Sequence, residues 1–133
     1  MNGLLLGIDL TEVGRVAELL DRWGERFLER VFQPGEIRRR RRHPRAFAEH
    51  VAGRFAAKEA AMKALGTGFR GVAFREIVVG RESSGKPRLE FRGRALERAR
   101  ALKVVGTEVS ITHTKTMAAA VVGLLTEDGG LRL

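Results

Sequence analysis

The chain has 133 residues, of which 44% are apolar and 31% are charged. This composition disfavours disorder and predicts one compact domain, so a sizeable ligand must lie in a surface cleft or between subunits. Lysine and arginine number 25 against 16 carboxylates, and the net charge of +9 predicts attraction to phosphate or to an acidic protein surface. The predominance of arginine suits bidentate contacts to either, although it can equally reflect genomic base composition.

Cysteine is absent, which excludes disulfides, thiolate zinc sites and a cysteine nucleophile and fits a reducing compartment. No apolar run approaches the ~20 residues of a membrane span. The N-terminus also lacks the charged flank that precedes the apolar part of a signal peptide. We therefore expect a soluble cytoplasmic protein with no membrane partner.

The first elements predicted along the chain are a strand and a helix. Residues 3–8 are an apolar run typical of a buried strand, and Asp9 then has the spacing of a helix N-cap, with Glu12 three residues later. The following helix has an apolar stripe, with three arginines together on another face, although Gly24 can divide this helix in two. The stripe consists of Val13, Val16, Leu20, Trp23 and Phe27, and the arginines are Arg15, Arg22 and Arg26.

The middle of the chain predicts a short polar helix, opened by a turn at residues 33–36 and containing the basic run 38–42, and then the longest helix, over residues 45–65. Gly66 stands at the C-cap of the long helix. Its apolar stripe also contains Lys58, so either this face borders a cleft or the lysine extends along it to water. The other members of this stripe are Phe47, Val51, Phe55, Met62 and Leu65.

The last part of the chain predicts a hairpin, a charged helix and two strands. The hairpin comprises residues 74–79 and 89–91, the helix covers residues 94–103, and the strands cover residues 109–112 and 118–125. No linker divides these elements. We expect one domain over residues 1–125 and a frayed tail over residues 126–133.

Asp9 and Glu59 are the carboxylates that indicate chemistry. Each also has an ordinary structural interpretation, a helix cap for Asp9 and a one-turn pair with Lys63 for Glu59. Taken together, a strand-end carboxylate and a helix carboxylate with open positions for water and phosphate are a usual way to hold Mg²⁺. Lys58, Lys63 and Arg54 would add cations to the same site, and this mixture stabilises phosphoryl transfer.

Four motifs of the sequence resemble those of the holo-acyl carrier protein synthases, small single-copy phosphopantetheinyl transferases that use coenzyme A. They are Gly7-Ile8-Asp9-Leu10 with Glu12 and Arg15, Gly53-Arg54-Phe55-Ala56-Ala57-Lys58-Glu59-Ala60 followed by Lys63-Ala64-Leu65-Gly66-Thr67-Gly68, Gly85-Lys86-Pro87, and Ser110-Ile111-Thr112-His113-Thr114. The resemblance covers about residues 5–124. It implies an α+β fold in which a short antiparallel sheet packs against a long helix.

The resemblance also implies roles for individual residues. Asp9 and Glu59 would hold Mg²⁺ against the coenzyme A pyrophosphate, and Lys63 would neutralise or protonate the departing phosphate. Glu59, directly or through a metal-held water, would remove the acceptor proton, and the water route is favoured because a cation lowers the pKa of a carboxylate that binds it. The residues that would line the coenzyme A site are Arg54, Lys58, Gly66, Thr67, Gly68, Pro87, His113 and Thr114.

The resemblance implies two partners. A neighbouring subunit would complete the cleft, commonly in a homotrimer with active sites at the subunit interfaces. The acceptor would be an acidic acyl carrier protein of fatty acid biosynthesis, steered electrostatically to Arg15, Arg22 and Arg26. The products would be holo-carrier protein and adenosine 3′,5′-bisphosphate.

Two other classes of function compete with this transferase. The net charge and the basic run 38–42 fit a nucleic-acid-binding module. That alternative leaves Asp9 and Glu59 unexplained, and with 6% aromatic residues the chain offers no evident platform for base stacking. An inert structural subunit would tolerate Asp9→Asn and Glu59→Gln without loss of any activity. We favour the transferase and expect no nucleic-acid partner.

Overall fold

The structure is a computed structural model that describes residues 3–38, 43–68 and 70–127. Its elements follow the order β1 (Gly3–Glu12), α1 (Val13–Trp23), α2 (Glu25–Val31), α3 (Pro44–Leu65), a 3₁₀ turn η1 (Phe74–Glu76), β2 (Ile77–Arg81), β3 (Pro87–Phe91), α4 (Gly93–Ala101), β4 (Val104–His113) and β5 (Met117–Thr126). The predicted α+β class, with a short antiparallel sheet against a long helix, is confirmed.

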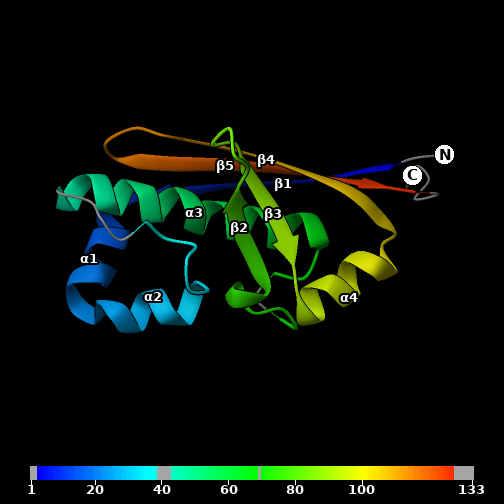
Figure 1. The fold of residues 1–133 in the computed structure, drawn as a ribbon, viewed down its shortest axis with the longest axis horizontal. Helices are drawn as coiled ribbons and strands as arrows, with labels where there is room; N and C mark the ends of the chain where they lie inside the picture. The colour runs from blue at the N-terminus through cyan, green and yellow to red at the C-terminus, as the bar shows by residue number, and fades with distance from the viewer. Residues whose placement is uncertain (1–2, 39–42, 69, 128–133) are drawn as a thin grey trace.

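The elements form three layers with α3 in the middle, as Figure 1 shows. The first layer is an antiparallel sheet with the strand order β1-β5-β4. The third layer, on the other side of α3, contains α1, α2, the β2–β3 hairpin and α4. Because α3 is enclosed by both layers, it is buried well beyond the single stripe expected of a surface helix.

The two sides of α3 differ in the size of their side chains. The side that faces the sheet carries small residues, and a Cβ atom on Gly7 of β1 would collide with main-chain atoms of Ala60 and Ala64. On the side toward the third layer, the ring of Phe55 stacks on Phe74 at a centroid distance of 5.2 Å. The small residues therefore let β1 and α3 approach backbone to backbone.

β1 extends further than the sequence predicted. It pairs with β5 from Gly3 to Glu12, and α1 begins only at Val13. The predicted N-cap at Asp9 is therefore wrong, because this residue lies inside a strand whose side chains alternate between two faces. The alternation points Asp9 toward α3.

The helices differ from their predictions at two places. Gly24, with φ of 51°, does divide the first helix, so the predicted stripe is broken and Trp23 is 49% exposed. Residues 36–38 are not helical, and residues 39–42 lie outside the described residues. In the described ranges, no helix combines the length and the apolar character needed to cross a membrane.

The remaining predicted elements are present. The long helix ends at Leu65 with Gly66 in the left-handed conformation, and α4 and β5 form close to the expected residues. Two strands differ in their bounds, because residues 74–76 form η1 instead of the start of the hairpin and β4 begins at Val104, five residues before the predicted strand. β5 continues to Thr126, which is buried, so the strand includes the first residue of the predicted tail. Residues 128–133 lie outside the described residues.

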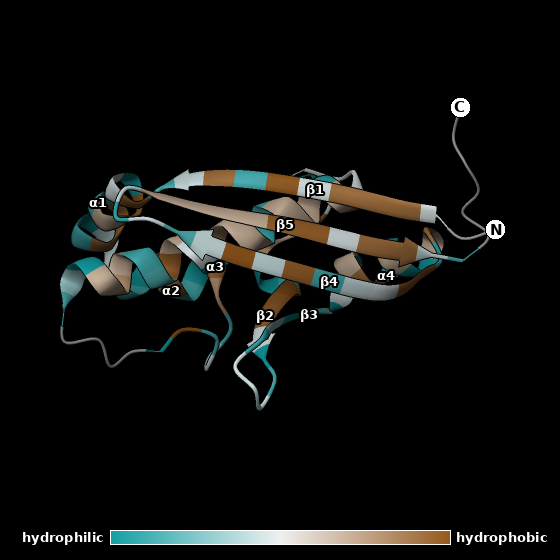
Figure 2. Cartoon of the chain, turned by 90° about the horizontal axis from the view of Figure 1, so that it is seen from above, coloured by the Kyte–Doolittle hydropathy of each residue, from teal (hydrophilic) through white to brown (hydrophobic). Residues whose placement is uncertain are grey.

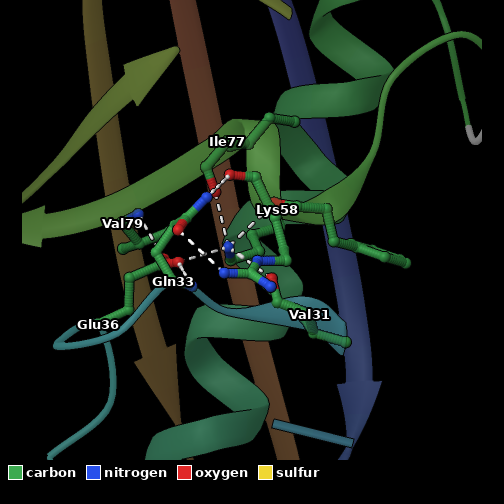
Figure 3. A network of polar contacts seen from close by, with 8 residues as sticks. Val31, Gln33, Glu36, Lys58, Ile77 and Val79 are labelled. Atoms are coloured by element: carbon green, nitrogen blue, oxygen red, sulfur yellow. Dashed lines mark hydrogen bonds and ion pairs between the residues drawn. The ribbon is translucent and has the colours of Figure 1, made fainter. Parts of the chain in front are cut away.

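Lys58 joins α3 to the third layer through a buried network, shown in Figure 3. Its ammonium is fully buried and lies 2.9 Å from Oε1 of Glu36. It also lies 2.9, 3.0 and 2.7 Å from the carbonyl oxygens of Val31, Phe74 and Ile77. Neither sequence-based alternative for Lys58 is correct, because the side chain reaches neither a cleft nor water.

Glu36 extends the same network to the turn after α2 and adds a second contact to β2. Its carboxylate accepts hydrogen bonds from the backbone N–H of Gln33 at 2.6 Å and of Val79 at 2.8 Å. Burial lowers the pKa of Lys58 to about 8 even though Glu36 opposes the shift. The pair thus ties the end of α2, the turn after it, η1 and β2 to a single point on α3.

We expect Lys58→Met and Glu36→Gln each to destabilise the fold, the lysine change by about 3–5 kcal/mol, because each leaves one buried partner without its counterpart. The double variant should cost less than the sum of the single variants, as measured by urea denaturation in a double-mutant cycle. The matched control is the exposed pair Lys86–Glu108, which is also 2.9 Å long. Its coupling should stay below about 1 kcal/mol, and equal coupling in both pairs would contradict the role given to Lys58.

Candidate active site

Asp9 and Glu59 are fifty residues apart in the sequence and meet where β1 packs on α3. Asp9 is buried on the helix-facing side of β1, and Glu59 is half-buried on α3. Burial, followed by the charge of the hydrogen-bonded Asp9 carboxylate, raises the pKa of Glu59 to about 7. The structure therefore brings together the two carboxylates singled out in the sequence, as a pair that holds a proton near neutral pH.

Three further side chains act on this pair. The ammonium of Lys63 lies 3.1 Å from Oδ1 of Asp9. Thr11 donates a hydrogen bond of 2.9 Å to Oδ2 of Asp9. The charges of Lys63 and Arg15 both lower the pKa of Glu59, against the larger effects that raise it. Sequence reasoning missed Thr11, although its position two residues after Asp9 places it on the same face of a strand.

The acidic pair fits a hard divalent cation. Two carboxylates close enough to hold one proton between them gain from a cation that replaces it. Across the described ranges, no group of three or more Asp, Glu, His or Cys residues is placed to bind a metal. The protein would thus supply two oxygen ligands and leave positions for water and phosphate oxygens, a donor set typical of Mg²⁺.

A cavity of about 310 Å³ is lined by several basic side chains and lies on the side of α3 away from Asp9 and Glu59. Three residues expected at a coenzyme A site, Arg54, Pro87 and His113, line it together. His50 and Arg81 also line it, and sequence reasoning did not single them out as site residues. The sequence pattern could have indicated both residues. His50 lies one helical turn before Arg54, and Arg81 is the cross-strand neighbour of Pro87 in the hairpin.

The acidic pair and this basic cavity lie on opposite flanks of α3. Glu59 and Arg54 are five residues apart, which separates their directions by about 140° around the helix axis. Asp9 lies on β1 and His113 on β4, the two edge strands of the sheet, with β5 between them. The two groups therefore face different surroundings in one chain. We call the acidic pair with Lys63 the acidic half-site, and the cavity with Arg54, Pro87 and His113 the basic half-site.

The glycine loop Gly66-Thr67-Gly68 belongs with the acidic half-site. It directly follows the turn of α3 that carries Lys63, and it lies about 18 Å along the helix axis from Arg54. The N–H of Thr67 donates to the carbonyl of Met62 and closes the helix end. Thr114, in contrast, stands beside His113, where its Oγ1 accepts a hydrogen bond from the N–H of Met117.

Lys58 does not belong to either half-site. Its ammonium is enclosed by Glu36 and three carbonyl oxygens, so the prediction that it lines a nucleotide site is wrong. Consecutive residues of a helix point about 100° apart, which turns Lys58 away from Glu59 into the third layer.

The three arginines expected to bind a carrier protein are divided between two helices. Arg15 and Arg22 lie on α1, and Arg26 lies on α2 beyond the break at Gly24. A groove of about 660 Å³ between these helices mixes apolar and basic side chains. It is lined by Leu19, Trp23, Arg26, Phe27, Glu29 and Arg30.

Comparison with known proteins identifies relatives of this chain. The family model described as the 4′-phosphopantetheinyl transferase superfamily matches residues 5–121. The holo-[acyl-carrier-protein] synthase of Maridesulfovibrio salexigens is 50% identical over 90% of this chain and 95% of that protein.

Solved structures agree with the sequence comparison. The holo-[acyl-carrier-protein] synthase from Neisseria meningitidis superposes with a TM-score of 0.79 at 29% identity, over 90% of this chain and 96% of that one. The holo-(acyl-carrier-protein) synthase from Bacillus anthracis, in complex with CoA (3′,5′-ADP), gives a TM-score of 0.72 at 33% identity, over 92% and 96% of the two chains.

Proposed function

The chain belongs to the holo-[acyl-carrier-protein] synthases of the 4′-phosphopantetheinyl transferase superfamily, and on this premise we propose the reaction that it catalyses. It transfers the 4′-phosphopantetheine group of coenzyme A to a serine hydroxyl of an apo acyl carrier protein. The products are the holo-carrier protein and adenosine 3′,5′-bisphosphate. We place this activity in the cytoplasm, in fatty acid biosynthesis.

The observation that carries this proposal is the pairing of Asp9 with Glu59 beside the Lys63 ammonium. Asp9 and Glu59 would hold Mg²⁺, which neutralises pyrophosphate charge when it is bound. The serine oxygen forms a bond to the pantetheine-side phosphorus as the bond from that phosphorus to the bisphosphate breaks. Lys63 stabilises or protonates the departing phosphate, and the serine proton leaves toward Glu59, directly or through a water.

The complete site is proposed to form between copies of the chain. Arg54, Pro87 and His113 bind the nucleotide from one subunit, while the acidic pair and the glycine loop belong to its neighbour. This division is supported by the half-sites on opposite flanks of α3. It also explains how a chain of this size can enclose a coenzyme.

The outer face of the sheet supports the assembly, which we propose is a homotrimer. In Figure 2 this face lies toward the viewer, with β5 between β1 and β4, and its exposed apolar side chains lie on β1 and β5. Six apolar residues of β1 and β5 are 42–66% exposed, an unusually large patch for an isolated domain. They are Leu4, Leu6, Ile8, Leu10, Val121 and Leu125.

The carrier protein is proposed to bind across α1 and α2. Arg15, Arg22 and Arg26 steer an acidic partner, and the groove that includes Trp23 and Phe27 offers apolar contact between them. Arg15 also lies near Glu59, so a carrier seated on these helices would present its serine beside the acidic pair. Association should weaken as salt rises.

The reaction itself is tested by mass spectrometry of an apo acyl carrier protein incubated with coenzyme A and Mg²⁺. We expect the carrier to gain one phosphopantetheine with the wild-type protein. Asp9→Asn should reduce the rate by at least about 100-fold, because it removes a charged ligand from the pyrophosphate site. An unmodified carrier in a reaction where a known transferase succeeds would refute the proposed function.

The shared site is tested by complementation. Asp9→Asn damages the acidic half-site and His113→Ala the basic one, so each homo-oligomer should be nearly inactive. In oligomers assembled from equal amounts of both variants, about a quarter of the sites combine two intact halves and should restore about that fraction of activity. Light scattering verifies that the oligomers form. No recovery in mixed oligomers, or full activity in a monomer, would contradict a site between subunits.

The metal site is tested by thermal unfolding with and without Mg²⁺ at two pH values. Below pH 7 the acidic pair retains its proton, since the pKa of Glu59 is about 7, and the proton competes with the cation. Mg²⁺ should therefore raise the melting temperature more at pH 8 than at pH 6. Glu59→Gln should remove this pH dependence, and an equal shift at both pH values in the wild type would count against the acidic pair as the metal ligands.

A further inference from the structure

The C-terminal end of α3 presents an electrostatic problem for a phosphate ligand. The 22 residues of α3 end at Leu65, directly before Gly66-Thr67-Gly68. A helix C-terminus carries roughly half a negative charge, which repels an anion. The proposed function nevertheless assigns this loop to the half of the site in which Asp9, Glu59 and Lys63 meet the coenzyme A pyrophosphate, so the phosphates would lie beside it. Lys63, the basic residue of the last turn, already contacts Asp9 and the carbonyl oxygen of Ile8, so a second cation is needed to offset the negative helix end at the loop.

Arg98 of α4 is positioned to supply that offset. Its Nε donates a hydrogen bond of 3.0 Å to the carbonyl oxygen of Leu65, one of the last carbonyls of α3. Its guanidinium also borders the loop, because a Cβ atom on Gly66 would lie 3.6 Å from Nη2 of Arg98. A full positive charge thus stands where the helix ends and the loop begins.

Among the residues that the structure describes, no carboxylate lies close enough to Arg98 to neutralise its charge. Within the described ranges Arg98 forms no ion pair shorter than 4.0 Å, whereas its neighbours Arg92 and Arg94 pair with Glu90 and Glu76. Arg98 is also not needed merely to end the helix. The left-handed Gly66 and the backbone hydrogen bonds from Gly66 and Thr67 already close the last turn.

We infer that Arg98 is a positioning residue of the donor site, which reverses the local field at the end of α3 and allows the coenzyme A phosphates to lie against Gly66-Thr67-Gly68. The inference rests on the proposed function, because that function brings the phosphates to this loop. Arg98 acts through the helix end and the loop, and it takes no part in bond making or breaking. It therefore affects binding of the donor more than turnover.

Three variants separate charge from hydrogen bonding. Arg98→Gln removes the charge and keeps a donor, whereas Arg98→Lys keeps the charge. Arg100→Gln is the matched control, since Arg100 is exposed on the same helix. Each variant is measured by initial rates against coenzyme A concentration, by calorimetric binding of coenzyme A to the protein alone, and by melting temperature.

We expect Arg98→Gln to raise the KM for coenzyme A and weaken its binding by about tenfold, with kcat within about twofold of the wild type. Arg98→Lys should recover most of the affinity, and Arg100→Gln should match the wild type.

Several results would overturn the inference. They are equal affinities for Arg98→Gln and Arg100→Gln, a loss of stability without a change in affinity, or an Arg98→Lys variant as weak as Arg98→Gln. A wild-type protein that binds coenzyme A in an Arg98-dependent manner but modifies no carrier would instead support the inference and refute the proposed function.

Discussion

The buried contact between Lys58 and Glu36 is the constraint on which the arrangement of the other elements depends. The third layer consists of short helices and a two-stranded hairpin, and none of these elements is long enough to be stable alone. A single ammonium that bonds to carbonyls of α2, η1 and β2 holds them in one orientation on α3. The contact therefore also determines where the groove on α1 and α2 and the cavity beside the hairpin lie relative to α3.

The sequence predicted those parts of the fold that depend on local pattern. The long helix, its glycine cap and the last two strands follow from periodicity and turn residues. The prediction failed at Asp9, because the capping pattern around it is local, whereas the pairing of β1 with β5 joins segments more than 100 residues apart. Tertiary pairing outweighed the local signal.

The same division holds for the candidate site. Asp9, Glu59 and Lys63 could be singled out because their residue types suit metal-assisted phosphate chemistry. Lys58 was misplaced because its partner, Glu36, lies 22 residues away in a turn without regular structure. The separation of the acidic and basic half-sites also escaped prediction, since it depends on which flank of α3 each neighbouring strand covers.

The close approach of Gly7 to Ala60 has a consequence for how the sequence can change over evolutionary time. These residues are near neighbours of Asp9 and Glu59, so the spacing of the carboxylates is determined by contact between main chains rather than by side-chain packing. Substitutions elsewhere in the core can accumulate without altering that spacing. The outer surfaces of the protein are thus free to diverge among descendants, while the main-chain contact limits how far the spacing of Asp9 and Glu59 can change.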